Sequence, residues 1–252
     1  MVKSSIVGYP VIGENREWKR ALEAFWAEII SEEELLRTTK DIRLANLKKQ
    51  QDAGVDRIAV GDFTLYDRVL DTSTMFGIIP SRYHWKGGQV SISTYFSMAR
   101  GNDDAVASEM TKWFNTNYHY IVPEYEGQRF QLTENKPLTA YREAKKELGI
   151  EGKPVLLGPY TLLKLSKGYE EIDVPSIILQ LIPLYQKVLQ ELQDEGVQWV
   201  QIDEPILCTS ISSDEMKTVT EIYLQLTKNI NSLNVLVQTY FDSVENYEAT
   251  LA

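Results

Sequence analysis

Residues 109–124 read EMTKWFNTNYHYIVPE, a stretch that holds a lysine, two asparagines, a histidine and four aromatic rings without a glycine. Residues 118–122 are rich in β-branched and aromatic side chains, which predicts a strand. Pro123 cannot donate a hydrogen bond to a neighbouring strand, so the strand should end there. Glu124 then lies just beyond the carboxyl end of a strand, which is where parallel α/β folds build their sites. The composition alone also fits an ordinary strand whose rings pack into the core.

Outward from this stretch, strands and helices alternate along the chain. The segments that we predict as strands are 6–10, 57–61, 118–122, 154–158, 197–202 and 233–237. The predicted helices are 15–29, 31–54, 138–148, 176–195 and 213–230. Residues 63–108 are expected to be irregular, with one short strand at 90–96. The alternation predicts an α/β fold, in which helices lie outside a parallel sheet.

The residues that follow the strands help to choose between two folds with a parallel sheet, the open doubly wound sheet and the closed (β/α)8 barrel. Each predicted strand leads to a small or polar residue: Gly8, Asp62, Glu124, Gly158, Asp203 and Gln238. No G-x-G-x-x-G motif follows a strand and the chain has no P-loop, so a (β/α)8 barrel of the TIM type is the better prediction. The chain supplies about six β-α units where a closed barrel needs eight. We therefore expect an incomplete barrel with two unpaired sheet edges, in the amino-terminal part of a longer protein.

Composition argues against several classes of function. The formal net charge of −10 disfavours a nucleic-acid partner, which would need a basic face. One cysteine, Cys208, and two histidines preclude an internal disulfide and offer almost nothing to a zinc site. No apolar run reaches the roughly 18–20 residues that cross a bilayer. Residues 1–8 lack the apolar run of a signal peptide, so we expect a soluble cytoplasmic protein without a membrane partner.

A cluster of charges marks the start of the first predicted helix. Asn15 can cap that helix, and Arg16, Lys19 and Arg20 lie in its first turns. Cations at this end oppose the helix dipole, at a cost of a few tenths of a kcal/mol each. They form either a solvated charged face or a cationic patch beside free N–H groups, which suits an anionic ligand.

Several motifs occur together and in one order along the whole chain. They are Gly8-Tyr9-Pro10, Arg16-Glu17-Trp18-Lys19, Val60-Gly61-Asp62-Phe63, Tyr66-Asp67, the stretch 109–124, Leu157-Gly158-Pro159-Tyr160-Thr161 and Gln201-Ile202-Asp203-Glu204-Pro205. In these motifs the sequence resembles the amino-terminal half of the cobalamin-independent methionine synthases, the 5-methyltetrahydropteroyltriglutamate–homocysteine methyltransferases. The stretch 109–124 is highly specific to that family.

The resemblance implies a fold and an activity for the whole protein. Family members carry two (β/α)8 barrels in one chain, so residues 1–252 are expected to form the amino-terminal barrel domain, truncated before the barrel closes. The full-length enzyme moves a methyl group from 5-methyltetrahydropteroyltriglutamate to homocysteine and makes methionine, without cobalamin. Zinc and homocysteine bind in the carboxyl-terminal barrel, the partner of this one, through ligands that have no counterpart here. This chain alone should be inactive.

The resemblance also implies which residues bind substrate. The amino-terminal half helps to hold the polyglutamate tail of the folate, through positions that match Arg16, Glu17, Trp18, Lys19 and Lys112. A triglutamate tail carries several carboxylates, for which Arg16, Lys19 and Lys112 are suitable cations. No catalytic residue and no metal ligand is expected in this chain. The turn Asp203-Glu204 looks like the duplicate of an acidic turn in the other barrel, and it is expected to have a structural or hydrogen-bonding role.

Two other functions stay open on the residues alone. A pair of carboxylates among Asp62, Glu124, Asp203 and Glu204, all at predicted strand ends, could catalyse glycoside hydrolysis. Alternatively, the chain could be a non-catalytic module that binds an anionic ligand through Arg16, Lys19 and Lys112.

Overall fold

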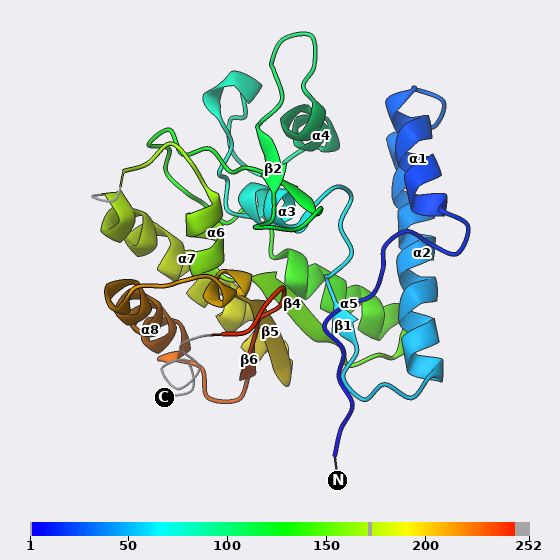
Figure 1. The fold of residues 1–252 in the computed structure, drawn as a ribbon. Helices are drawn as coiled ribbons and strands as arrows, with labels where there is room; N and C mark the ends of the chain where they lie inside the picture. The colour runs from blue at the N-terminus through cyan, green and yellow to red at the C-terminus, as the bar shows by residue number, and fades with distance from the viewer. Residues whose placement is uncertain (1, 171–172, 245–252) are drawn as a thin grey trace. The chain divides into compact units, whose positions relative to one another are not determined.

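The computed structural model describes residues 2–170 and 173–244 (Figure 1). The chain forms two compact units, each built from two separate segments. The first unit comprises Met1–Leu65 and Lys136–Val155, and the second comprises Tyr66–Asn135 and Leu156–Ala252. Strand β4 (Lys153–Leu157) is the element in which the chain passes from the first unit to the second.

Helices dominate the first unit. Its elements are α1 (Glu17–Trp26), α2 (Glu32–Asp52), β1 (Ala59–Val60), α5 (Lys136–Leu148) and the first residues of β4. Ser31 caps α2 by accepting a hydrogen bond from the backbone N–H of Glu34 at 3.2 Å. Helix α2 packs against α1 and α5 (Figure 1). The Arg43 guanidinium donates to both oxygens of Glu143, at 2.6 and 2.9 Å, and fixes α2 on α5.

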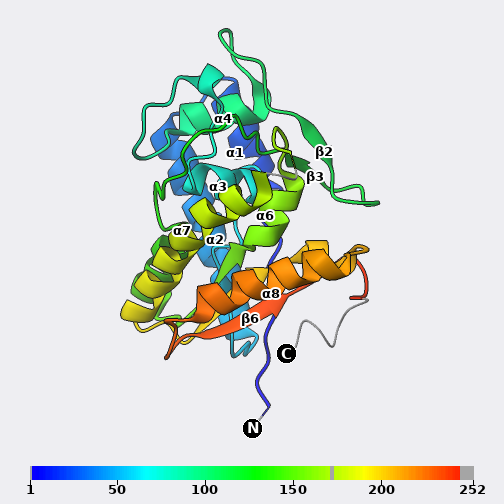
Figure 2. The same ribbon diagram turned by 90° about the vertical axis from the view of Figure 1, so that its left-hand side faces the viewer.

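The second unit contains the remaining elements. They are α3 (Arg68–Met75), η1 (Ser81–Tyr83), α4 (Ile92–Arg100), β2 (Met110–Lys112), β3 (His119–Ile121), α6 (Pro159–Leu165), α7 (Val174–Asp194), β5 (Trp199–Asp203), η3 (Pro205–Cys208), α8 (Ser213–Thr227) and β6 (Asn234–Gln238). Helix α7 packs against both α6 and α8 (Figure 2). It buries a stripe that includes Leu181, Tyr185, Val188 and Leu192, the side predicted from the 3.6-residue period.

The strands confirm the predicted parallel sheet. Strand β1 pairs in parallel with β4, and β5 pairs in parallel with β6 from Trp199↔Asn234 to Asp203↔Gln238. The order of the hydrogen-bonded strands is β1-β4-β5-β6. Four of the six predicted strands therefore lie in this sheet. Residues 6–10 form no strand, and the chain near them makes a single parallel bridge, Ser5↔Arg57.

The strand predicted at 118–122 is confirmed as β3, but its expected place in the parallel sheet is wrong. Strands β2 and β3 form a separate antiparallel hairpin, in the register Met110↔Ile121 and Lys112↔His119. The chain reverses because Phe114 takes a left-handed conformation, with φ of 47°. The Thr116 hydroxyl donates to the carbonyl of Trp113 at 2.7 Å and stabilises the turn. A phenylalanine rarely adopts positive φ, so a reversal of the chain at this residue was not expected from the sequence.

The expectation of an irregular segment at 63–108 is also wrong. Helices α3 and α4 lie within it, and the strand expected at 90–96 belongs largely to α4. Both helices have side-chain caps: Asp67 accepts from the backbone N–H groups of Val69 and Leu70, and Ser91 accepts from that of Thr94. The short helix α6, which begins directly after β4, was not expected either.

Candidate functional site

The motif Arg16-Glu17-Trp18-Lys19 begins α1 in the first unit. The N-cap residue is Arg16, not the predicted Asn15, and it has a left-handed backbone with φ of 63°. The Glu17 carboxylate accepts hydrogen bonds from the backbone N–H of Asn15 at 2.9 Å and from its side-chain amide at 3.2 Å. The N–H groups of Glu17 itself and of Asn15 lower the pKa of the Glu17 carboxyl. Glu17 therefore holds the turn that displays Arg16.

Trp18 anchors the same turn from its other side. Its indole Nε1–H donates to the carbonyl of Thr64 at 3.1 Å, and the ring is half-buried. This contact ties the start of α1 to the chain that follows β1. Glu17 and Trp18 are thus occupied by contacts that shape the turn.

The cations of this motif differ in how strongly they are engaged. Arg16 is exposed, and its guanidinium makes no hydrogen bond or ion pair with any residue that the structure describes. Lys19 lies 3.5 Å from Glu23, in an exposed pair of the kind that contributes little energy. The Arg20 guanidinium donates to the carbonyl of Asn15. Arg16 is therefore the most available cation for binding an anion, and Lys19 is the second most available.

Lys112 lies at the end of β2 in the second unit. Its side chain is exposed and forms no ion pair within residues 2–170 and 173–244. The hairpin that carries it is held on α3, because the backbone N–H of Ile121 donates to Asp67 at 3.0 Å. Burial raises the pKa of Asp67 to about 7, although the N–H groups of Leu70, Ile121 and Val69 oppose this rise. The five residues that the resemblance singled out therefore fall into two groups, one in each unit.

An aromatic cluster supports the hairpin from a distant part of the chain. Phe241, which follows β6, lies with its ring centroid 5.7 Å from Trp113 and 5.8 Å from Phe114. Tyr118 adds a third ring at 6.3 Å from Phe241. Such pairs contribute about 0.5–1.5 kcal/mol each beyond simple burial. The cluster and Asp67 together fix the position of Lys112 within the second unit.

The carboxylates considered for glycoside hydrolysis are engaged in structural contacts. Arg82 donates to both oxygens of Glu124, at 2.7 and 2.8 Å, and although burial opposes it, this pair lowers the pKa of Glu124. Asp62 accepts from the backbone N–H of Tyr9 at 2.7 Å. Asp203 is fully buried and paired with Arg68. The contacts give these groups structural roles, and nothing in the described residues supports a glycosidase.

Glu204, like Asp203, is a fully buried carboxylate. It accepts from the backbone N–H and the hydroxyl of Thr161, at 2.7 and 2.5 Å, and from the hydroxyl of Tyr223 at 3.1 Å. Gly158 is required beside it, because a Cβ there would overlap the Glu204 carboxyl group. The expected hydrogen-bonding role of the Asp203-Glu204 turn fits these contacts. Burial outweighs the donors and raises the pKa of Glu204 to about 7.

Replacing Glu204 by glutamine should flatten the dependence of stability on pH. Between its ordinary value of 4.5 and about 7, the folded protein keeps the Glu204 proton that the unfolded chain has lost, so the free energy of unfolding falls as pH rises. The variant should reduce this slope by up to about 1.4 kcal/mol per pH unit. Urea unfolding at several pH values measures it. Glu221→Gln, at an exposed position on α8, is the matched control. An unchanged slope in Glu204→Gln would contradict this role.

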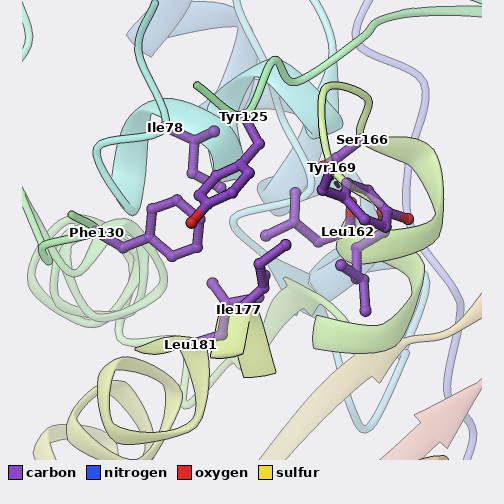
Figure 3. A pocket seen from close by; sticks show the side chains of 9 residues that line it. Ile78, Tyr125, Phe130, Leu162, Ser166, Tyr169, Ile177 and Leu181 are labelled. Atoms are coloured by element: carbon purple, nitrogen blue, oxygen red, sulfur yellow. Dashed lines mark hydrogen bonds between the residues drawn. The ribbon is translucent and has the colours of Figure 1, made fainter. Parts of the chain in front are cut away.

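The second unit also contains a small apolar cavity (Figure 3). Its volume is about 10 Å³, and its lining includes Ile78, Tyr125, Phe130, Leu162 and Ile177. That volume is no more than a single water needs. The lining is mostly apolar, although Ser166 and Tyr169 also contribute to it, and the cavity is too small to hold a substrate.

The described part of the chain offers neither a metal site nor a membrane-spanning helix. Within it, no three His, Cys, Asp or Glu side chains come together as a set that could hold a metal ion. Cys208 is half-buried, and burial raises the pKa of its thiol, which disfavours the thiolate that zinc would need. The described helices include none with the length and apolar character of a membrane span.

Sequence reasoning missed Arg68 and Arg82, the two arginines that neutralise buried or half-buried carboxylates. Both lie in the segment 63–108 that was expected to be irregular. Arg68 is 135 positions away from Asp203, and Arg82 is 42 away from Glu124. A weak signal was present, since a carboxylate at the end of a buried strand needs a cationic partner.

Comparisons with known proteins agree on one family. The family described as "Cobalamin-independent synthase, N-terminal domain" matches residues 3–252. A protein of Halalkalibacterium halodurans named 5-methyltetrahydropteroyltriglutamate–homocysteine methyltransferase is 57% identical over 99% of this chain, and the protein of that name from Listeria welshimeri is 56% identical over 98%. The chain spans only 33% of each of these relatives.

A solved structure gives the fold. A Listeria monocytogenes protein described as a candidate vitamin-B12-independent methionine synthase superposes with a TM-score of 0.59 at 16% identity. The match covers 95% of this chain and 65% of that one. The α/β architecture predicted from the alternation of strands and helices is thereby confirmed.

Proposed function

Since the chain belongs to the cobalamin-independent synthase family, as its N-terminal domain, we propose that it is the amino-terminal part of a methyltransferase. The whole enzyme would transfer a methyl group from 5-methyltetrahydropteroyltriglutamate to homocysteine and release methionine. Relatives that are 53–57% identical carry this activity in their names. They are about three times as long, so the remaining polypeptide would complete the barrel and add a second one. The single cysteine suits a reducing, cytoplasmic location.

The role that we assign to this chain is to bind the polyglutamate tail of the folate. One observation carries the assignment: in a chain of net charge −10, the exposed cations Arg16 and Lys112 form no ion pair with any described residue. Carboxylates would supply the missing partners through charge-assisted hydrogen bonds. The planar guanidinium of Arg16 can donate two hydrogen bonds to one carboxylate, while Lys19 and Lys112 act as point charges. Glu17 and Trp18 would contribute by holding the turn that presents Arg16 and Lys19.

No residue of this chain is assigned to the chemical step. The described residues do not fit zinc, and we place the zinc site and the homocysteine site in the part of the polypeptide that lies outside these residues. The family description excludes cobalamin as the cofactor. This part of the enzyme would therefore act on binding: it would hold the distal end of the substrate and leave the reacting end to the rest of the polypeptide.

The proposal is tested by comparing the full polypeptide with residues 1–252 alone. The full polypeptide should form methionine from homocysteine and the triglutamate folate. The isolated chain should form none, and elemental analysis should find no stoichiometric zinc in it. Methionine formation by the isolated chain, or one tightly held zinc per chain, would contradict this division of labour. Failure of the full polypeptide with both substrates would reject the activity itself.

A further inference from the structure

The register of the β2–β3 hairpin places His119 directly opposite Lys112. In an antiparallel pair, opposite residues point to the same face, with their Cβ atoms about 5 Å apart. Both side chains are exposed. The next pair, Thr111↔Tyr120, points to the other face, where Tyr120 is buried and its hydroxyl donates to the carbonyl of Leu165 at 3.4 Å. Lys112 and His119 therefore share the opposite face from Tyr120 and are both exposed there, although Ile121, farther along that face, is buried.

The hairpin itself carries no negative charge. The chain has 36 acidic residues among 252, yet residues 110–121 contain none. Glu109, which comes just before them, is already paired with Lys167 at 2.8 Å. Neither Lys112 nor His119 makes a side-chain hydrogen bond or ion pair with any part of the chain that the structure describes. Two donor side chains therefore stand side by side, exposed, and without an internal acceptor.

We propose that Lys112 and His119 form a two-point clamp for one carboxylate of the folate tail. This inference rests on the proposed function and deepens it. The ammonium of Lys112 supplies charge without directional preference, and an imidazole N–H beside it supplies a directed hydrogen bond to the second carboxylate oxygen. A clamp of this kind recognises a carboxylate group rather than charge in general. It would make His119 a specificity-determining residue for tail length.

The geometry of the hairpin favours such a clamp over a solvated pair. Asp67 and the rings around Phe241 hold the hairpin at both of its ends. Positions on a fixed hairpin keep their spacing, so a ligand that bridges them loses less conformational entropy than one that orders a mobile loop. The strand positions also limit each side chain to the same face, where one carboxylate can meet both.

The test is binding of folates of two tail lengths to variants of the full polypeptide. In His119→Ala, the dissociation constant for the triglutamate folate should rise about fivefold, and that for the monoglutamate folate less than about twofold. His119→Gln keeps a neutral N–H donor and should recover most of the triglutamate affinity. His84→Asn changes the other histidine of the chain, which is exposed and has φ of 54°, a conformation that asparagine tolerates; it should leave both affinities unchanged.

The outcomes separate the clamp from the proposed function. If Lys112→Ala weakens only the triglutamate folate while His119→Ala changes neither folate or both equally, the clamp is refuted and tail binding stands. If Lys112→Ala shows no preference for tail length, tail binding at this hairpin is refuted as well. Thermal unfolding of each variant serves to show that it is folded, and His119→Gln decides the question should His119→Ala fold poorly.

Discussion

Replacing Lys112 by alanine is expected to weaken binding of the triglutamate folate by about tenfold, and binding of the monoglutamate folate by less than about threefold. Lys112 is exposed, lies on an anchored hairpin and forms no ion pair with the described residues. Its removal therefore leaves no buried charge behind, and the loss reports the contact with the ligand alone. The longer tail has carboxylates that the shorter one lacks, so it loses more.

The measurement is equilibrium titration of both folates into the full polypeptide. Lys187→Ala is the matched control, because it removes the same charge from the second unit at an exposed position on α7, where Lys187 lies 4.0 Å from Glu191. The control should bind both folates as the wild type does. Equal losses for the two folates in Lys112→Ala, or the same loss in Lys187→Ala, would count against a specific role in tail binding.

Replacing Arg68 by alanine should lower the free energy of unfolding by about 3 kcal/mol. Its partner Asp203 is fully buried at the carboxyl end of β5, where it also accepts hydrogen bonds from the side-chain amide of Gln201 at 2.7 Å and from the hydroxyl of Tyr240 at 3.4 Å. Neither of these neighbours carries a positive charge. Without the guanidinium, Asp203 must either stay charged in the core or take up a proton, and both are costly near neutral pH.

Chemical denaturation at neutral pH measures this loss. Lys217→Ala provides the contrast, because Lys217 and Asp214 form a pair at 2.7 Å whose side chains are 73% and 90% exposed. An exposed pair of this kind should contribute less than about 1 kcal/mol. A loss of comparable size in the two variants would mean that the Arg68–Asp203 pair does not stabilise the fold as its burial implies.

Helices with a long apolar stripe or a clear cap were predicted well from the sequence. The helix expected at 31–54 is α2, the one at 138–148 is α5 and the one at 176–195 is α7, each within a few residues. The strands β4, β5 and β6 were also placed correctly. Short apolar runs that alternate with helices along the chain are typical of a buried parallel sheet.

Elements that depend on a single unusual residue could not be predicted in this way. The hairpin of 110–121 exists because Phe114 adopts a conformation that glycine or asparagine usually takes, and only its second strand was predicted, at 118–122. The helices α3 and α4 are short, at eight and nine residues, so their periodicity is weak. Their caps, Asp67 and Ser91, were the available signals.

The candidate site depended on resemblance for its residues and on the structure for its physical argument. Sequence patterns alone left Arg16, Lys19 and Lys112 open to several interpretations. The structure adds that Arg16 and Lys112 are exposed without an internal acidic partner, and that Glu17 and Trp18 hold the turn beside Arg16. It also assigns the strand-end carboxylates to structural contacts, which no reading of spacing could have shown because their partners are distant in sequence.

The most direct test of tail binding is calorimetric titration of the full polypeptide with the triglutamate folate and with the monoglutamate folate, at two salt concentrations. Recognition of the tail by exposed cations predicts tighter binding of the triglutamate form, with an advantage that shrinks as salt screens the charges. Equal affinity for the two folates at both salt concentrations would contradict the assignment of Arg16, Lys19 and Lys112 to the polyglutamate tail.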